Sequence, residues 1–145
     1  MHFLNMMKQH KLDEIIKHLE FELNNQSGIM FAYIYGSVLS SDNPRDIDIA
    51  VYLFPADFEK LSREGEVSLS FAIPLEMELE KQLKRKADVQ VLNRAPLAFR
   101  YRVIADGKVI VDKDSNTRCD FEYISRVEYY DFSPRRKEYL QEVMA

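Results

Sequence analysis

The sequence has little cysteine and no long hydrophobic run, and these absences exclude several classes of protein. Cys119 is the single cysteine of 145 residues, so a disulfide framework within the chain and a cysteine metal cluster are both excluded. We expect Cys119 to be a half-buried thiol with a structural role. No apolar stretch reaches the roughly 20 residues of a membrane span, and the N-terminal segment lacks the pattern of a signal peptide. These features predict a cytoplasmic protein with no membrane partner.

An excess of positive charge is also missing. Lys and Arg number 20 against 24 Asp and Glu, which gives a net charge of -4. Broad, nonspecific nucleic-acid binding depends on clustered basic residues that neutralise phosphates, so we do not expect it here. Hydrophobic residues make up 46% and charged residues 30%, as in ordinary globular proteins. The length fits one core, which predicts a single domain over residues 1–145.

The order of periodic segments predicts an α/β fold, with a small mixed β-sheet flanked by helices. The predicted strands define a core over about residues 28–113. Residues with helical spacing lie between these strands and on both sides of the core. Strands are predicted at 28–37, 46–54, 87–93 and around 109–111. Helices are predicted at about 8–25, in two pieces within 56–86, from about 96, and at 115–144 in two pieces separated by Ser133 and Pro134.

Two carboxylates interrupt the second predicted strand. Side chains two residues apart on a strand share a face, so Asp46 and Asp48 point the same way. The alternating residues, such as Ile47 and Ile49, make the strand look buried, where paired acids are costly without a cation. A divalent metal ion suits such a pair, and a solvated acidic face is the alternative. Arg45 is the nearest cation, and we favour a role in offsetting carboxylate repulsion over one in phosphate binding.

A Gly-Ser pair ends the first predicted strand. Gly36 allows the backbone to approach a ligand closely, and free amides after it can hold a phosphate. Ser37 as a helix N-cap is an alternative that is compatible with phosphate binding. Asp88, at the start of the third strand, is expected to face the same point, although the preceding "KQLKRK" offers an ion pair instead. Three carboxylates and a phosphate cradle indicate metal-assisted nucleotidyl transfer.

The segments "YGS", "DIDIAVYL" and "ADVQVLNRAPLAFRYRVIADGKVIV" together resemble the nucleotidyltransferase superfamily that includes DNA polymerase beta. More narrowly, the chain resembles the minimal nucleotidyltransferase (MNT) family, the antitoxins of HEPN/MNT toxin-antitoxin pairs. The resemblance implies the minimal nucleotidyltransferase fold with a C-terminal helical tail. It also implies a protein adenylyltransferase that uses ATP and transfers AMP to a tyrosine hydroxyl of a partner, a HEPN ribonuclease toxin.

The same resemblance assigns roles to individual residues. Gly36 and Ser37 would contact the nucleotide phosphates, and Asp46 and Asp48 would bind Mg²⁺ or Mn²⁺. Asp88 would be the third carboxylate, which helps to hold the metal and accepts the proton of the attacking hydroxyl. The chain departs from the family where only eight residues separate Ser37 from Asp46, a short spacer for this family.

Other features allow more than one interpretation. The arginines of "RAPLAFRYR" suit phosphate or adenine binding, but a solvated helix face fits them equally well. The C-terminal tyrosines at 123, 129, 130 and 139 are either interface anchors or packing residues. Two other functions stay open: an antitoxin that neutralises its toxin by binding alone, and a nucleotidyltransferase for a small molecule such as an aminoglycoside. The second would need an acceptor site for which 145 residues leave little room, and a homo-oligomer would supply one.

Overall fold

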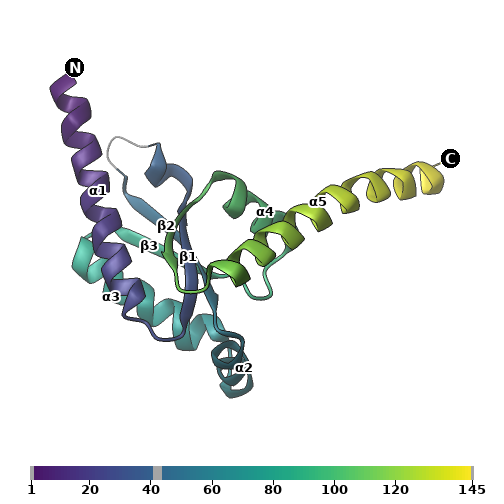
Figure 1. The fold of residues 1–145 in the computed structure, drawn as a ribbon, viewed down its shortest axis with the longest axis horizontal. Helices are drawn as coiled ribbons and strands as arrows, with labels where there is room; N and C mark the ends of the chain where they lie inside the picture. Colours follow the sequence, from purple (N-terminus) through teal and green to yellow (C-terminus); the bar gives the residue numbers. More distant parts are fainter. Residues whose placement is uncertain (1, 41–43, 145) are drawn as a thin grey trace.

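The computed structural model describes residues 2–40 and 44–144, with the side chains of residues 11–40, 44–131 and 142 (Figure 1). Asp42 and Asn43, expected in a polar loop, lie outside the described residues. The elements in chain order are α1 (His2–Asn24), β1 (Ile29–Tyr35), the 3-10 turn η1 (Gly36–Leu39), β2 (Asp46–Leu53), α2 (Pro55–Glu64), the π-helical turn η2 (Ser68–Ala72), α3 (Ile73–Leu83), β3 (Lys86–Val91), α4 (Leu97–Asp106), β4 (Lys108–Asp112) and α5 (Ser115–Met144).

The four strands form one mixed sheet in the order β3-β2-β1-β4. β1 is antiparallel to β2 and β4, whereas β2 and β3 are parallel. All seven residues of β1 are buried, which agrees with its continuous apolar sequence and its central place. In β2 the apolar residues alternate with Asp46 and Asp48, so the strand buries one face completely and carries polar groups on the other. The predicted α/β fold with a small mixed sheet is confirmed.

Helices cover both faces of the sheet (Figure 1). On one face, Leu19 of α1 and Leu79 of α3 pack with Ile47 and Ile49 of β2, and all four side chains are fully buried. The other face holds a smaller cluster in which Tyr33 and Ala50 of the sheet pack near Val103 of α4. Burying each large aliphatic side chain contributes about 1.5–3 kcal/mol. The sheet is therefore held from both sides, with its polar positions emerging at one end of β2 and β3.

The outer edge of β3 is closed by side chains of α3. Glu80 Oε1 accepts a hydrogen bond from the amide of Ala87 at 3.0 Å, and Glu76 Oε1 accepts one from the amide of Val89 at 2.8 Å. These amides point away from β2, because alternate residues of a strand pair with one neighbour only. An exposed edge strand invites pairing with other chains. The two glutamates occupy this edge next to the polar end of the sheet.

The C-terminal segment forms one helix, α5, of 30 residues, and the predicted break at Ser133 and Pro134 is wrong. An interior proline costs a helix about 3 kcal/mol, but α5 is long enough for the turns on both sides to offset that cost. α1 likewise begins at His2, earlier than the predicted start near residue 8. Figure 1 shows α5 leaving the body of the molecule as it runs toward the C-terminus.

Charged groups tie the start of α5 to the sheet. Arg118 donates to Asp112 Oδ2 of β4 and to Glu122 Oε1, both at 2.9 Å. Tyr33 of β1 donates its hydroxyl proton to the same Glu122 oxygen at 2.8 Å. Burial raises the pKa of Tyr33 far above its usual range, and Glu122 raises it further, so the phenol stays neutral and keeps donating.

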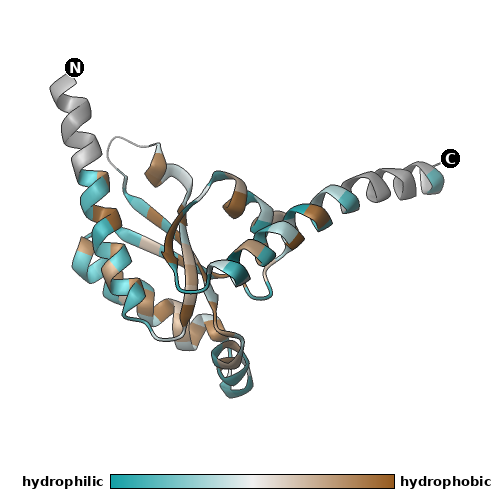
Figure 2. Ribbon diagram, viewed as in Figure 1, coloured by the Kyte–Doolittle hydropathy of each residue, from teal (hydrophilic) through white to brown (hydrophobic). Residues whose placement is uncertain are grey.

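Several hydrophobic side chains stay exposed along α3 and α5, where Figure 2 shows brown segments among teal ones. On α5, Tyr123 is 68% exposed, whereas Tyr129 stacks on Tyr101 of α4 with ring centroids 4.0 Å apart. The side chain of Tyr139 lies outside the described residues. Cys119 is exposed, so the expectation of a half-buried thiol is wrong. Within the described part of the chain, no helix is both long and apolar enough to span a membrane.

Candidate active site

Three carboxylates gather where β2 and β3 lie side by side. Asp48 is directly opposite Asp88 in the parallel register, and Asp46 is opposite Lys86. Asp46, Asp48 and Asp88 line one cavity of about 440 Å³ together with Ser37, Lys86 and the two glutamates of α3. The structure thus brings together the predicted site residues Ser37, Asp46, Asp48 and Asp88, although Ser37 and Asp88 lie far apart in the sequence. Lys86 is the basic residue that sequence reasoning missed, since only the register reveals it.

Gly36 lets the backbone pass directly against Asp48. Its φ angle is +82°, in the left-handed region that favours glycine. A Cβ atom at this position would lie 2.6 Å from Asp48 Oδ2, a distance that no real Cβ tolerates. Gly36 opens the short turn η1, whose capping position is Tyr35, and Ser37 lies inside the turn. The N-cap interpretation of Ser37 is therefore wrong, and its side chain is left to face the cavity.

The fold perturbs the ionisation of Asp48. Burial raises its pKa above the usual range, and repulsion from Asp88 and then Asp46 raises it further. Arg102 of α4 lowers the pKa again, because its guanidinium favours the ionised carboxylate. A cation beside the acids was expected, and Arg102 is a cation that the fold brings to them. Arg45 is exposed and does not line the cavity, so its predicted role stays a prediction.

Asp48 also borders a second cavity, of about 540 Å³, on the side of α4. Its lining residues are Tyr35, Gly36, Leu39, Ser40, Asp48, Arg102 and Asp106. Burial raises the pKa of Tyr35 to about 12, and the charges of Asp48 and Asp88 add to the shift. The phenol is therefore neutral at pH 7. This cavity combines the Gly36 turn with the positive charge of Arg102, two features that suit an anionic ligand.

Asp88 has an unexpected neighbour on its own strand. Gln90 Nε2 donates to Asp88 Oδ1 at 2.9 Å, since residues two apart share one face of β3. No ion pair joins Asp88 to the basic residues before it in the described chain, which removes the alternative drawn from "KQLKRK". The spacing of Asp88 and Gln90 was visible in the sequence, but an exposed glutamine carries no signal of its own.

The other two arginines of "RAPLAFRYR" serve different neighbours. The guanidinium carbon of Arg94 lies 5.1 Å from the centre of the Phe58 ring, and Arg100 lies 3.6 Å from Glu128 of α5. Arg102 alone of the three lines a cavity with Asp48. The structure therefore places the three arginines of this segment in three separate surroundings.

The donor set fits a divalent cation. Asp46, Asp48 and Asp88 offer only oxygen atoms, the ligands that Mg²⁺ and Mn²⁺ prefer. Their register places them on one face of two adjacent strands. As the side chains lie, no three His, Cys, Asp or Glu residues within the described ranges converge to hold an ion. Binding would therefore require the carboxylates to turn toward one another.

The sequence profile of the family described as "Polymerase beta, Nucleotidyltransferase" matches residues 16–116. The chain belongs to this family. The match runs from α1 to the start of α5 and includes Gly36, Ser37 and all three carboxylates. It confirms the superfamily resemblance drawn from the sequence, and with it a nucleotide substrate. No curated protein matches this nucleotidyltransferase.

Solved toxin-antitoxin complexes contain chains with a similar fold. One is the complex of a tri-AMPylated Shewanella oneidensis HEPN toxin with an MNT antitoxin, at 21% identity and a TM-score of 0.57, over 95% of this chain and 99% of the other. A toxin-antitoxin structure with AMP-PNP matches at 21% identity and a TM-score of 0.58, over 92% and 98% of the two chains. An MntA-HepT complex matches at 20% identity and a TM-score of 0.56, over 94% and 99%. At such identities the likeness shows a shared fold over nearly the whole nucleotidyltransferase.

Proposed function

We propose that this nucleotidyltransferase moves AMP from ATP to a tyrosine hydroxyl of a HEPN toxin and so acts as an antitoxin. The observation that carries the proposal is the meeting of Asp46, Asp48 and Asp88 in one cavity beside the Gly36 turn. Support for the partner comes from the similar chains, which occur in complexes of an MNT antitoxin with a HEPN toxin and of a toxin-antitoxin pair with AMP-PNP. The proposed place of action is the cytoplasm.

The residues divide the work of binding and proton transfer. The backbone of Gly36 and the hydroxyl of Ser37 hold the triphosphate, and Arg102 adds positive charge on the side of α4. Asp46, Asp48 and Asp88 would hold Mg²⁺ or Mn²⁺, which would neutralise triphosphate charge when bound. Arg45 offsets the charge of the acids or contacts a phosphate.

The transfer is a substitution at the α-phosphorus of ATP. The tyrosine oxygen forms a bond to that phosphorus, and the bond from phosphorus to the bridging oxygen breaks. Pyrophosphate leaves with the electron pair of the broken bond. Asp88 takes the phenolic proton, since its side chain is exposed and an acceptor can reach it.

Mass spectrometry tests the proposal directly. The purified chain is incubated with ATP, Mg²⁺ and the HEPN protein encoded beside it, and we expect AMP mass on a tyrosine of that protein and loss of its ribonuclease activity. Asp88→Asn should form the same complex and transfer AMP about 10²-fold or more slowly, since it removes a proton acceptor but keeps the shape. An unmodified partner that is nevertheless inactive would contradict the transfer reaction.

A binding-only antitoxin is the second candidate, and one observation favours it. The three carboxylates do not converge on an ion as they lie in the described structure, and the spacer after Ser37 is short. The double variant Asp46→Asn/Asp48→Asn separates the two candidates. Neutralisation that survives in this variant supports occlusion of the toxin, whereas its loss together with AMP transfer supports the enzyme. Efficient transfer to an aminoglycoside would instead support a small-molecule enzyme.

The proposed metal site has its own test, in thermal stability. Mg²⁺ or Mn²⁺ should raise the melting temperature of the wild type, because an ion that binds only the folded chain stabilises it. The increase should disappear in Asp48→Asn, which loses a central ligand. Differential scanning fluorimetry with and without the ion measures both effects. An equal increase in the variant would remove Asp48 from the metal site.

A further inference from the structure

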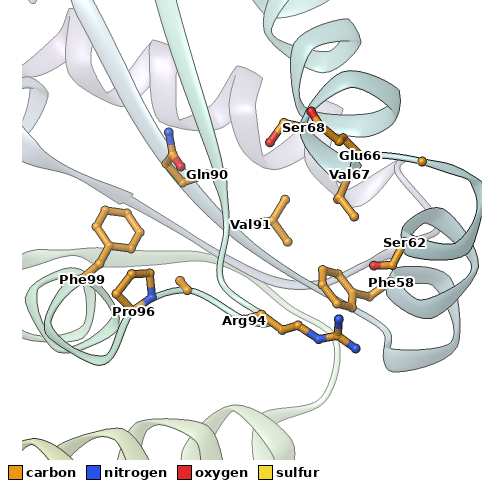
Figure 3. Close-up of a pocket in the computed structure, with 12 residues that line it drawn as sticks. Phe58, Ser62, Glu66, Val67, Ser68, Gln90, Val91, Arg94, Pro96 and Phe99 are labelled. Atoms are coloured by element: carbon orange, nitrogen blue, oxygen red, sulfur yellow. The ribbon is translucent and has the colours of Figure 1, made fainter.

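A third cavity, of about 590 Å³, lies against the end of β3 (Figure 3). It is formed by α2, the segment around η2, the end of β3 and the start of α4. Its lining residues are Phe58, Ser62, Gly65, Glu66, Val67, Ser68, Gln90, Val91, Arg94, Ala95, Pro96 and Phe99. Arg94 comes from the segment that suits phosphate or adenine binding, but the residues proposed to hold the phosphates and the metal ion do not line this cavity and leave it without a role.

The walls of this cavity suit an aromatic ring. Figure 3 shows Phe58, Val67 and Val91 around one space, with Phe99 and Pro96 toward its other end. Aromatic and aliphatic walls favour a flat apolar group by area burial and by ring-to-ring contacts. The guanidinium of Arg94 already lies 5.1 Å from the centre of the Phe58 ring. A planar guanidinium stacks readily on a second ring that enters beside it.

Gln90 connects the cavity to the proposed site of chemistry. Its side chain lines the cavity and donates to Asp88 Oδ1 at 2.9 Å. Two residues along a strand span about 7 Å, so the cavity and the Asp88 carboxylate are roughly one side chain apart. A tyrosine carries its hydroxyl at the far end of the ring, so a ring held in the cavity can present that hydroxyl to Asp88. A serine or threonine hydroxyl lies next to its own backbone, so such a side chain cannot fill the cavity and also present its hydroxyl to Asp88.

Within the described residues, the glutamate hydrogen bonds along the edge of β3 end at Val89. Glu80 and Glu76 accept the outward amides of Ala87 and Val89, and Val91 is the next residue of β3 with an outward amide. Val91 lines the cavity. The backbone of an incoming segment can therefore pair here while its side chain enters the cavity, the usual way in which an edge strand binds an extended segment.

We propose that this cavity is the acceptor site and holds the ring of the tyrosine that receives AMP. This inference rests on the proposed function and adds the place of the second substrate. The tyrosine hydroxyl reaches Asp88, which takes its proton as the phenolic oxygen bonds to the α-phosphorus and pyrophosphate leaves. ATP binds from the second cavity, which Gly36 and Arg102 border. Gln90 is a positioning residue that holds Asp88 between the two substrates.

Binding of a simple phenol tests the cavity without a protein partner. The probe is N-acetyl-tyrosinamide, added to the ¹⁵N-labelled chain, and we expect amide shifts at Gln90, Val91 and Phe99. Ser68→Trp places an indole in the cavity and should abolish these shifts. Ser70→Trp is the matched control, since Ser70 is exposed on the same turn and does not line the cavity. Shifts that persist in Ser68→Trp would overturn the proposal.

AMP transfer and nucleotide binding complete the test. With ATP, Mg²⁺ and the HEPN protein, Ser68→Trp should lower the transfer rate about tenfold or more, while Ser70→Trp transfers like the wild type. AMP-PNP affinity, measured by calorimetry, should be equal in all three chains. Loss of AMP-PNP affinity in Ser68→Trp would assign the cavity to adenine and overturn the acceptor role. If Ser68→Trp transfers AMP at the wild-type rate, the acceptor role of the cavity is refuted and the proposed function stands. If the wild type transfers AMP to no acceptor, the proposed function is refuted as well.

Discussion

At the scale of single residues, Gly36 is a position where the fold leaves no space for a side chain. Gly36→Ala forces a Cβ into the left-handed region and against Asp48 Oδ2. We expect a loss of about 1–3 kcal/mol in the free energy of unfolding and a loss of AMP-PNP affinity, because Asp48 must move. Urea unfolding and calorimetric titration measure the two effects.

Gly65 provides the control for that substitution. Its φ is +156°, and a Cβ there would meet nothing within 4 Å. Gly65 lines the proposed acceptor cavity and does not contact Asp48, so Gly65→Ala should lower stability while AMP-PNP affinity stays at the wild-type value. If both variants bind AMP-PNP like the wild type, the contact between Gly36 and Asp48 has no part in nucleotide binding.

The raised pKa of Asp48 predicts how stability depends on pH. A carboxyl whose folded pKa exceeds the unfolded value of about 3.9 stabilises the fold while it is protonated, and this contribution is lost as pH rises through the folded pKa. Asp48→Asn should therefore be more stable than the wild type at pH 7, and the difference should vanish near pH 4 and below. Urea unfolding at several pH values tests this. Asp131→Asn, at an exposed position of α5, should show no such dependence, and an equal gain there would contradict the explanation.

At the scale of elements, the closed edge of β3 makes a second prediction. Glu76→Ala/Glu80→Ala leaves the outward amides of Ala87 and Val89 without their carboxylate acceptors. We expect faster hydrogen exchange at these two amides and a greater tendency of the chain to associate through the edge. Glu78→Ala is the control, because Glu78 on the same helix accepts a hydrogen bond from Gln82 of α3 and, within the described residues, from no amide of β3. Unchanged exchange in the double variant would show that water replaces the glutamates without cost.

The attachment of α5 to the sheet depends on Arg118. Arg118→Gln leaves Asp112 and Glu122 without their shared cation, which should cost about 2–3 kcal/mol in the free energy of unfolding. Arg126→Gln on the same helix removes a half-exposed pair at 3.9 Å and should cost about 0–0.5 kcal/mol. Chemical denaturation gives both values. Equal effects would mean that the network around Glu122 does not hold the helix.

Local sequence patterns predicted the elements well where burial decides the structure. The alternation in "DIDIAVYL" located β2 and its polar face, and the apolar run before Gly36 located β1. The predicted break in α5 failed because a proline signals only a local cost, which a long helix can offset. Gln90, Lys86 and the edge-closing glutamates were missed for another reason, since their roles depend on strand register and on neighbouring elements. Arg102 was noticed in the sequence, but only the packing of α4 brings it to Asp48.

At the scale of the whole molecule, both hydrophobic clusters lie on one sheet. Ile34 and Ile49 face one cluster, whereas Tyr33 and Ala50 of the same strands face the other. Because both clusters are built on the same strands, one cannot unfold while the other stays intact. The predicted single domain should therefore unfold in one cooperative transition. Far-UV circular dichroism and tyrosine fluorescence should give coincident urea curves, since the chain has no tryptophan to dominate the emission. Two separated transitions would indicate two domains.

Asp48 borders two of the cavities described above, one toward α3 and one toward α4. A single carboxylate that forms part of two walls cannot change its position or charge for one ligand without changing it for the other. Occupancy on the two sides is therefore thermodynamically linked, and linkage is reciprocal. If a cation on the α3 side changes the affinity for an anion on the α4 side by some factor, the anion changes the affinity for the cation by the same factor.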